Sequence, residues 1–165
     1  MKRIMIAAST LALILTACGG SEHDASPEPT PTPTACATPG GIWAVTLTYG
    51  TATASGCAGL TGQSSDRLSI AVNGSAFALS DPAGTGTGAW DAATCHGTAS
   101  ISTTRQIGTN ASGDAVIGAI ATAYDLTFTA TSVTGTVTIS EAIAGMVVPG
   151  YPCSVPVTIT GTPAQ

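Results

Sequence analysis

The sequence predicts an all-β domain: an antiparallel meander of about eight short strands, closed or nearly closed as a barrel, with a β-sandwich as the alternative. Apolar residues alternate with threonine, serine and alanine along most of residues 41–162, which is typical of half-buried strands. Clusters of Gly, Asn, Asp and Pro separate these runs, and no substantial amphipathic helix pattern interrupts them. Charged residues make up only 8% of the chain, so few can protect exposed strand edges, and closing the sheet removes such edges.

The expected strands follow one another with short connections. They are residues 41–50, 67–74, 75–80, 95–102, 114–121, 124–130, 133–140 and 153–162. Asn73-Gly74 predicts a tight hairpin turn, because both residues tolerate positive φ. Pro156 has no amide hydrogen and predicts an edge or a bulge in the last strand. The glycine-rich run 84–88 lacks the lysine and helix of a phosphate-binding loop, so we expect a flexible hairpin loop there.

The amino-terminal segment has the organisation of a secretory signal. Lys2 and Arg3 precede an apolar core, residues 4–15, that is too short for a stable membrane span of ~20 residues. The stretch 15–18, Leu-Thr-Ala-Cys, resembles the lipobox of bacterial lipoproteins. The resemblance implies that residues 1–17 are a signal peptide and that Cys18 becomes the acylated amino terminus, carrying diacylglycerol on its sulfur. The alternative is an ordinary signal peptide cleaved near Ala17.

The segment 18–35 is predicted to be a lipidated cysteine followed by a disordered tether. Its Pro/Thr-rich sequence has almost no apolar side chains and favours an extended polyproline conformation. Two or more acyl chains hold a protein stably on a membrane, so the partner expected for Cys18 is the lipid bilayer. In lipoproteins of Gram-negative bacteria, a residue other than Asp after the cysteine favours the outer membrane, and Gly19 stands there. The expected location is therefore the cell envelope, at the outer membrane.

Composition and spacing exclude several functions for the single domain of residues 36–165. Arg67 and Arg105 are its only cations, and nucleic-acid binding requires clustered positive charge. His96 is its only histidine, and strand alternation turns it outward, so no catalytic triad is expected. Asp125 and Glu141 are interpreted as solvated surface charges, which disfavours a hydrolase. The sequence indicates no catalytic residue, no metal site and no cofactor.

The domain contains four cysteines, none of them in a CxxC pair. An even number in an exported domain predicts two disulfides, and three pairings are open. The cysteines are Cys36, Cys57, Cys95 and Cys153.

The stretch Gly41-Ile42-Trp43 is similar to the Gly-x-Trp that opens lipocalin and avidin barrels. The resemblance implies that Trp43 packs near the closed end of a barrel whose last strand, ending in the sequence ITGT, pairs beside the first. The end of the first strand then lies near the start of the last. This arrangement favours the bridges Cys57–Cys153 and Cys36–Cys95.

The function predicted is a non-enzymatic binding or interaction module that holds a small apolar ligand or meets an envelope protein. The alternative is a purely structural surface lipoprotein with a filled core. Loop 143–151 is unusually apolar, and we expect it to fold over an open barrel end or to contact a partner. Aromatic side chains are the candidates to line a ligand cavity. They are Trp43, Tyr49, Phe77, Trp90 and Tyr124.

Overall fold

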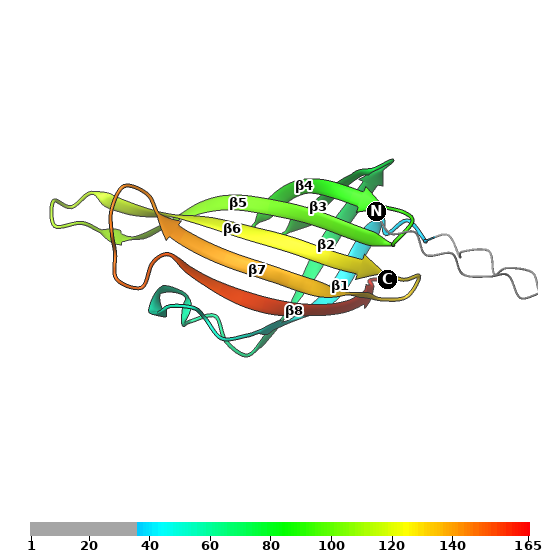
Figure 1. The fold of residues 1–165 in the computed structure, drawn as a ribbon, viewed down its shortest axis with the longest axis horizontal. Coiled ribbons are helices and arrows are strands. Elements are labelled where there is room, and N and C mark those ends of the chain that lie inside the picture. Colours follow the sequence, from blue (N-terminus) through cyan, green and yellow to red (C-terminus); the bar gives the residue numbers. More distant parts are fainter. Residues whose placement is uncertain (1–35) are drawn as a thin grey trace, which may run out of the picture. The chain divides into compact units, whose positions relative to one another are not determined.

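A computed structural model describes residues 36–165, which form a closed barrel of eight antiparallel strands (Figure 1). Each strand pairs with the next along the chain, and β8 returns to pair with β1. The strands are β1 (Gly41–Tyr49), β2 (Gln63–Asn73), β3 (Ala76–Asp81), β4 (Gly84–Asp91), β5 (His96–Thr109), β6 (Ala115–Phe128), β7 (Val133–Ile143) and β8 (Cys153–Pro163). A short 3-10 helix, η1 (Ser55–Cys57), lies between β1 and β2. The predicted meander barrel is confirmed. Residues 1–35, which include the predicted signal peptide, Cys18 and the predicted tether, lie outside the described residues.

The last strand is not an edge, and the interpretation of Pro156 is corrected. β8 pairs with β7 from Cys153 to Gly161, and Pro156 stands opposite Thr138 within that ladder. Its carbonyl accepts a hydrogen bond from the Gly50 amide, just past the end of the β1–β8 ladder. The amide and carbonyl of one residue point to the same side of a strand, so the nitrogen of Pro156, which carries no hydrogen, faces the end of β1. The β7–β8 ladder therefore loses no hydrogen bond to this proline.

The number of strands agrees with the prediction from the sequence, but the residues assigned to them differ. The two runs expected at 114–121 and 124–130 are one continuous strand, β6. The glycine-rich run 84–88, expected as a flexible loop, opens strand β4. A Cβ atom on Gly88 would lie 1.8 Å from the Thr98 carbonyl oxygen, so this glycine permits a close approach of two strands. The β2–β3 hairpin is present, but its two turn residues are Gly74, at φ 62°, and Ser75.

Aromatic side chains fill one end of the barrel, called here the closed end. Trp43, Phe77, Trp90 and Phe128 are buried, and their neighbouring ring centroids lie 5.4 to 6.4 Å apart. The Trp43 indole donates a hydrogen bond of 2.8 Å to the Pro39 carbonyl. This end carries the tight hairpins after β2, β4 and β6, and an eight-stranded barrel is narrow enough for side chains to fill it.

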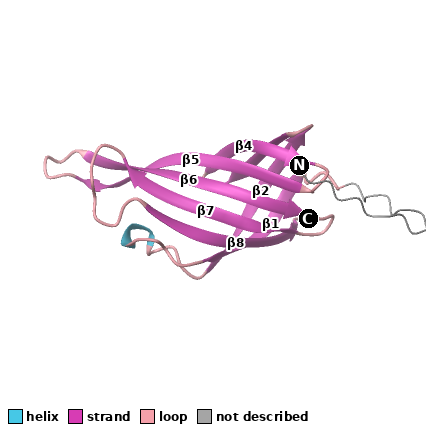
Figure 2. Cartoon of the chain, in the orientation of Figure 1, coloured by secondary structure: helices cyan, strands magenta, loops and turns pink. Residues whose placement is uncertain are grey.

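The opposite end carries the longer connections (Figure 2). The β5–β6 hairpin projects beyond the other strands there, beside the loop that joins β7 to β8 (Figure 1). The 13-residue β1–β2 connection, residues 50–62, contains η1 and is bridged to β8 through Cys57–Cys153. The second bridge joins Cys36 to Cys95 at the closed end. Both disulfides are the pairs favoured by the expected contact of the first and last strands.

Among residues 36–165, no helix has the length and apolar character needed to cross a bilayer.

Candidate functional site

The β2–β3 and β4–β5 ladders stop short of the end of the barrel that carries the long connections. Residues 63–68 of β2 pair with β1 only, because β3 pairs with residues 69–73. Residues 101–109 of β5 pair with β6 only, because β4 pairs with residues 96–100. The short β3–β4 hairpin lies between these two segments. We call the resulting opening, bounded by residues 63–68, 101–109 and the turn at 82–83, the notch.

A cavity of about 260 Å³ lies inside the barrel at this end. This volume is just below the ~300–1,000 Å³ of pockets that take drug-sized ligands, so its occupant would be smaller. The apolar part of its lining is aliphatic and comprises Leu47, Leu60, Ile120, Val137, Ile139 and Val157. The polar part comprises Tyr49, Asp66, Asp81, Arg105, Thr122, Tyr124 and Glu141. The cavity therefore combines an aliphatic wall with a strongly polar one.

All four charged lining residues stand on the inward parity of their strands. Asp66 is two residues from buried Leu68, Asp81 is two from buried Leu79, and Glu141 follows the inward series of β7. The interpretation of Glu141 as a solvated surface charge is therefore wrong, since only 3% of the residue is exposed. Asp125 is an outward carboxylate, as expected.

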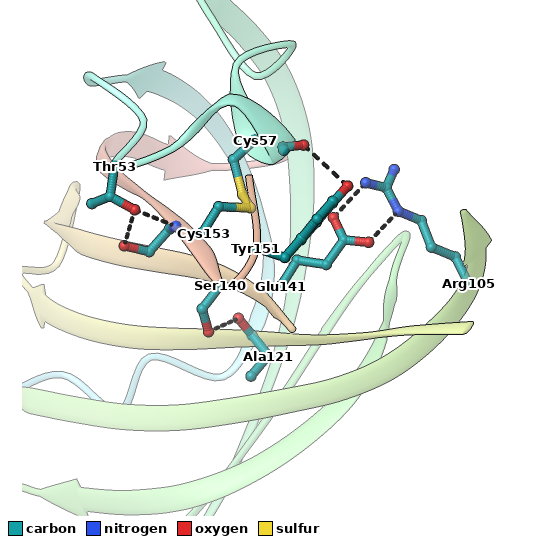
Figure 3. Close-up of a disulfide and its surroundings, with 10 residues drawn as sticks. Thr53, Cys57, Arg105, Ala121, Ser140, Glu141, Tyr151 and Cys153 are labelled. Carbon is teal, nitrogen blue, oxygen red and sulfur yellow. Dashed lines mark hydrogen bonds and ion pairs between the residues drawn. A yellow bond between two sulfur atoms is a disulfide. The ribbon is translucent and has the colours of Figure 1, made fainter. Parts of the chain in front are cut away.

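Glu141 is compensated by Arg105 at the edge of the cavity (Figure 3). Arg105 Nε donates to Glu141 Oε1 at 2.8 Å, and Nη2 donates to Oε2 at 2.5 Å. Hydrogen bonding to this carboxylate raises the pKa of the Arg105 guanidinium. The pair is a bidentate ion pair with one buried and one solvent-facing partner.

The Glu141 carboxylate also lies against the Cys57–Cys153 bridge. A Glu141 oxygen and the two sulfur atoms lie within 4.8 Å of one another, a spacing that free thiolates could use to hold a metal ion. Because these sulfurs are bonded to each other, the group does not offer the thiolate ligands of a zinc site. Next to the bridge, the Tyr151 hydroxyl donates to the Gly56 carbonyl at 3.3 Å, which ties the β7–β8 loop to the β1–β2 connection (Figure 3).

The second polar group of the cavity is centred on Tyr124. Its hydroxyl donates a short hydrogen bond to Asp81 Oδ2, and the other oxygen of Asp81 accepts from the amides of Ala83 and Gly84. Burial, followed by the hydrogen bond to Asp81 and the charges of Asp81 and Asp66, raises the pKa of Tyr124. Tyr124 is therefore a neutral donor in the cavity wall.

The five aromatic residues proposed to line a cavity fall into two groups. Tyr49 and Tyr124 line the cavity. Trp43, Phe77 and Trp90 do not, because they pack with Phe128 at the closed end. Sequence reasoning missed Asp66, Asp81 and Arg105, because all three lie just outside the strands expected at 67–74, 75–80 and 95–102, and only the longer observed strands include them.

The apolar loop 143–151 does not plug the barrel. Its tip projects into solvent, with Val147 99% exposed and Met146 45% exposed. Its two ends are held: Ile143 pairs with Gly118 in the β6–β7 ladder, and Gly56 donates a backbone hydrogen bond to Gly150 while Tyr151 contacts the same segment.

His96 and Asp125 lie together on the outer face, 2.7 Å apart, away from the cavity lining. The outward prediction for His96 is confirmed.

A larger and shallower hollow lies on the outside of the barrel. This groove of about 1110 Å³ runs along outward threonine, serine and alanine side chains of β8, β1 and β2, and Ile42 and Arg67 also line it. It shares Asp66, Asp81 and Pro82 with the inner cavity, so these residues lie where the groove and the cavity meet at the notch.

The described residues thus define a disulfide-braced, eight-stranded meander barrel with one end filled and a polar cavity at the other. The chain matches no protein-family model, and no curated protein and no solved structure is significantly similar to it.

Proposed function

We propose that residues 36–165 are a non-enzymatic binding module that holds a small molecule in the cavity, and that lipid on Cys18 anchors it in the cell envelope, at the outer membrane. The observation that carries the binding part is the polar inner wall. Asp66, Asp81, Arg105 and Glu141 all line the interior, whereas the closed end is filled with apolar rings.

A charged inner wall is not expected in a barrel whose role is purely structural. Placing charged groups inside a protein reduces stability unless they are fully compensated, and apolar replacements of a buried ion pair are often more stable. Small-molecule sites combine an apolar lining with a few polar groups that orient the ligand. The cavity has this composition, which favours binding over a filled, structural barrel.

The direct test is binding to the purified mature protein. Native mass spectrometry of material isolated without denaturant should show a bound small molecule. Calorimetric titration should show binding of cyclohexylmethanol, a compact probe with an aliphatic body and one polar group.

Ile139→Phe extends a lining side chain into the cavity, and it should weaken this binding by about tenfold or more, which is ~1.4 kcal/mol. Ile117→Phe is the matched control, because Ile117 is 45% exposed and lines neither the cavity nor the outer groove. If Ile139→Phe does not fold, Leu60→Trp is the second variant to test, because it fills the cavity from the β1–β2 connection. If the protein carries no small molecule and binds neither this alcohol nor its amine and carboxylate analogues, the binding proposal is wrong. The alternative, a purely structural lipoprotein, would then be favoured.

The anchor is tested separately. Mass spectrometry of the mature chain should find Cys18 as an acylated amino terminus, and Cys18→Ser should release the protein from the membrane fraction. Cys36, the first described residue, is bridged at the closed end. A tether that joins there is attached opposite the cavity. An unmodified amino terminus would remove the anchor and leave the binding proposal standing.

A further inference from the structure

The cavity contains more negative than positive charge, and the excess lies at the notch. Glu141 is paired with Arg105, but Asp66 and Asp81 form no ion pair within residues 36–165. Asp81 accepts only from the Tyr124 hydroxyl and two backbone amides. Asp66 Oδ1 accepts from the backbone amide of Arg67, a residue whose side chain strand alternation turns to the outer face. Three acids and one base line the cavity, a formal charge of −2 from −3 and +1.

We propose that the ligand is a small organic cation, a protonated amine on a compact aliphatic body, with its ammonium group at Asp66 and Asp81. This inference rests on the proposed function and specifies the chemistry of its ligand. An ammonium group supplies the positive charge that both carboxylates lack, and it can donate to Asp66 Oδ2, the oxygen of Asp66 that accepts no hydrogen bond from the described residues. Charge-assisted hydrogen bonds are the stronger kind.

The rest of the cavity fits the body of such a molecule. Leu47, Ile120, Val137 and Val157 provide aliphatic surface that gains from covering an apolar group. A carboxylate ligand in the same position would meet two uncompensated negative charges, since the one interior cation is already engaged by Glu141. A bare divalent ion would find two carboxylates beside aliphatic groups, whereas calcium takes six to eight oxygen ligands.

The position of the two aspartates gives them a second effect. Both residues line the outer groove as well as the cavity, whereas Arg67 lines the groove alone, so negative charge still exceeds positive charge where the groove and the cavity meet. Negative charge at the opening of a low-dielectric cavity concentrates cations there and repels anions. The same two side chains would therefore select by charge during access and in the bound state.

The experiment compares three probes of nearly equal shape on the mature protein: cyclohexylmethylamine, cyclohexylmethanol and cyclohexanecarboxylate. Calorimetry at pH 7 should show the amine binding about tenfold or more tightly than the alcohol, with the carboxylate weakest. Because this ranking is measured on the unchanged protein, it does not depend on any variant folding.

Asp66→Asn should lower the affinity for the amine by about tenfold and change that for the alcohol by less than about twofold. Asp125→Asn is the matched control, because Asp125 lies on the outer face and should leave both affinities unchanged. Calcium chloride alone should neither bind with measurable heat nor displace the amine.

The outcomes separate the two proposals. If none of the three probes binds, the binding function itself fails. If the alcohol or the carboxylate binds as tightly as the amine, the cavity is a binding site and the inference of a cationic ligand is wrong. Equal loss of amine and alcohol affinity in Asp66→Asn, or displacement of the amine by calcium, would also overturn it.

Discussion

Arg105 on β5 and Glu141 on β7 are joined across β6 by two hydrogen bonds, of 2.8 and 2.5 Å. The two partners differ in exposure: 56% of the Arg105 side chain is accessible, against 4% of the Glu141 side chain. Removing the arginine leaves a buried carboxylate without its cation, whereas removing the carboxylate charge leaves an arginine that can turn to solvent. The two ends of this ion pair should therefore contribute unequally to stability.

We expect Arg105→Gln to lower the free energy of unfolding by about 3 kcal/mol and Glu141→Gln by about 1 kcal/mol. Urea unfolding of both variants with the disulfides intact measures the difference. The double variant completes the cycle and should be more stable than Arg105→Gln alone, because no buried charge is left unpaired. Equal losses from the two single changes would show that Glu141 regains water when its partner is removed.

Gly88→Ala should destabilise the barrel by about 3 kcal/mol, at the upper end for overpacking. The added Cβ would lie 1.8 Å from the Thr98 carbonyl oxygen, and backbone cannot withdraw as a flexible side chain can. Gly108→Ala is the matched control, since a Cβ there meets nothing within 4 Å. Thermal and urea unfolding of both variants measure the effect. Similar losses in both would indicate a general cost of alanine in these strands, and the contact with β5 would then not be the cause.

The alternation of apolar and polar residues was sufficient to predict the barrel and the inward face of most strands. Leu68, Phe77, Val137 and Ile159 point inward as that pattern predicts, because burial of one face fixes the register of a strand. Continued one residue past the expected strand 133–140, the same parity places Glu141 inside. It was missed because a charged residue was assumed to face water, although a carboxylate can be buried when an arginine compensates it.

Other features depend on contacts that a single sequence does not display. The glycines of β4 are interpretable only once β5 is known to approach them, since glycine-rich runs are more often loops. The notch arises because β3 and β4 are shorter than β2 and β5, and strand ends are the least certain part of any pattern. Without the notch, Asp66 and Asp81 cannot be recognised as members of one polar wall.

Removing the Cys57–Cys153 bridge with paired serine substitutions should lower the free energy of unfolding by about 4.7 kcal/mol in the loop-entropy model. This bridge joins residues that are 96 apart in the sequence, against 59 for Cys36–Cys95. Removing Cys57–Cys153 should therefore lower the free energy of unfolding as much as removing Cys36–Cys95, or slightly more. The two paired variants, compared by urea unfolding, test this order.

The two bridges should differ more clearly in their effect on the cavity. Cys57 lines it, so loss of this bridge should also weaken binding of cyclohexylmethanol, whereas loss of Cys36–Cys95 at the closed end should not. Equal effects of both paired variants on binding would mean that the β1–β2 connection does not shape the site.

Tyr124 should make the stability of the barrel depend on alkaline pH. Burial and the hydrogen bond to Asp81 raise its pKa in the folded state, while in the unfolded chain a tyrosine ionises near ~10. The folded state then holds a proton that the unfolded state releases, so the contribution of Tyr124 is complete below pH ~10 and declines as the pH rises further. The decline can reach ~1.4 kcal/mol per pH unit.

Tyr124→Phe cannot ionise, and it also lacks the donor to Asp81, so it should be less stable than the unchanged protein at pH 8 by about 1–2 kcal/mol. The gap between the two proteins should narrow between pH 10 and 11, as followed by urea unfolding at each pH. A gap that stays constant over this interval would mean that Tyr124 ionises equally in both states, and that its hydroxyl is open to water in the folded barrel.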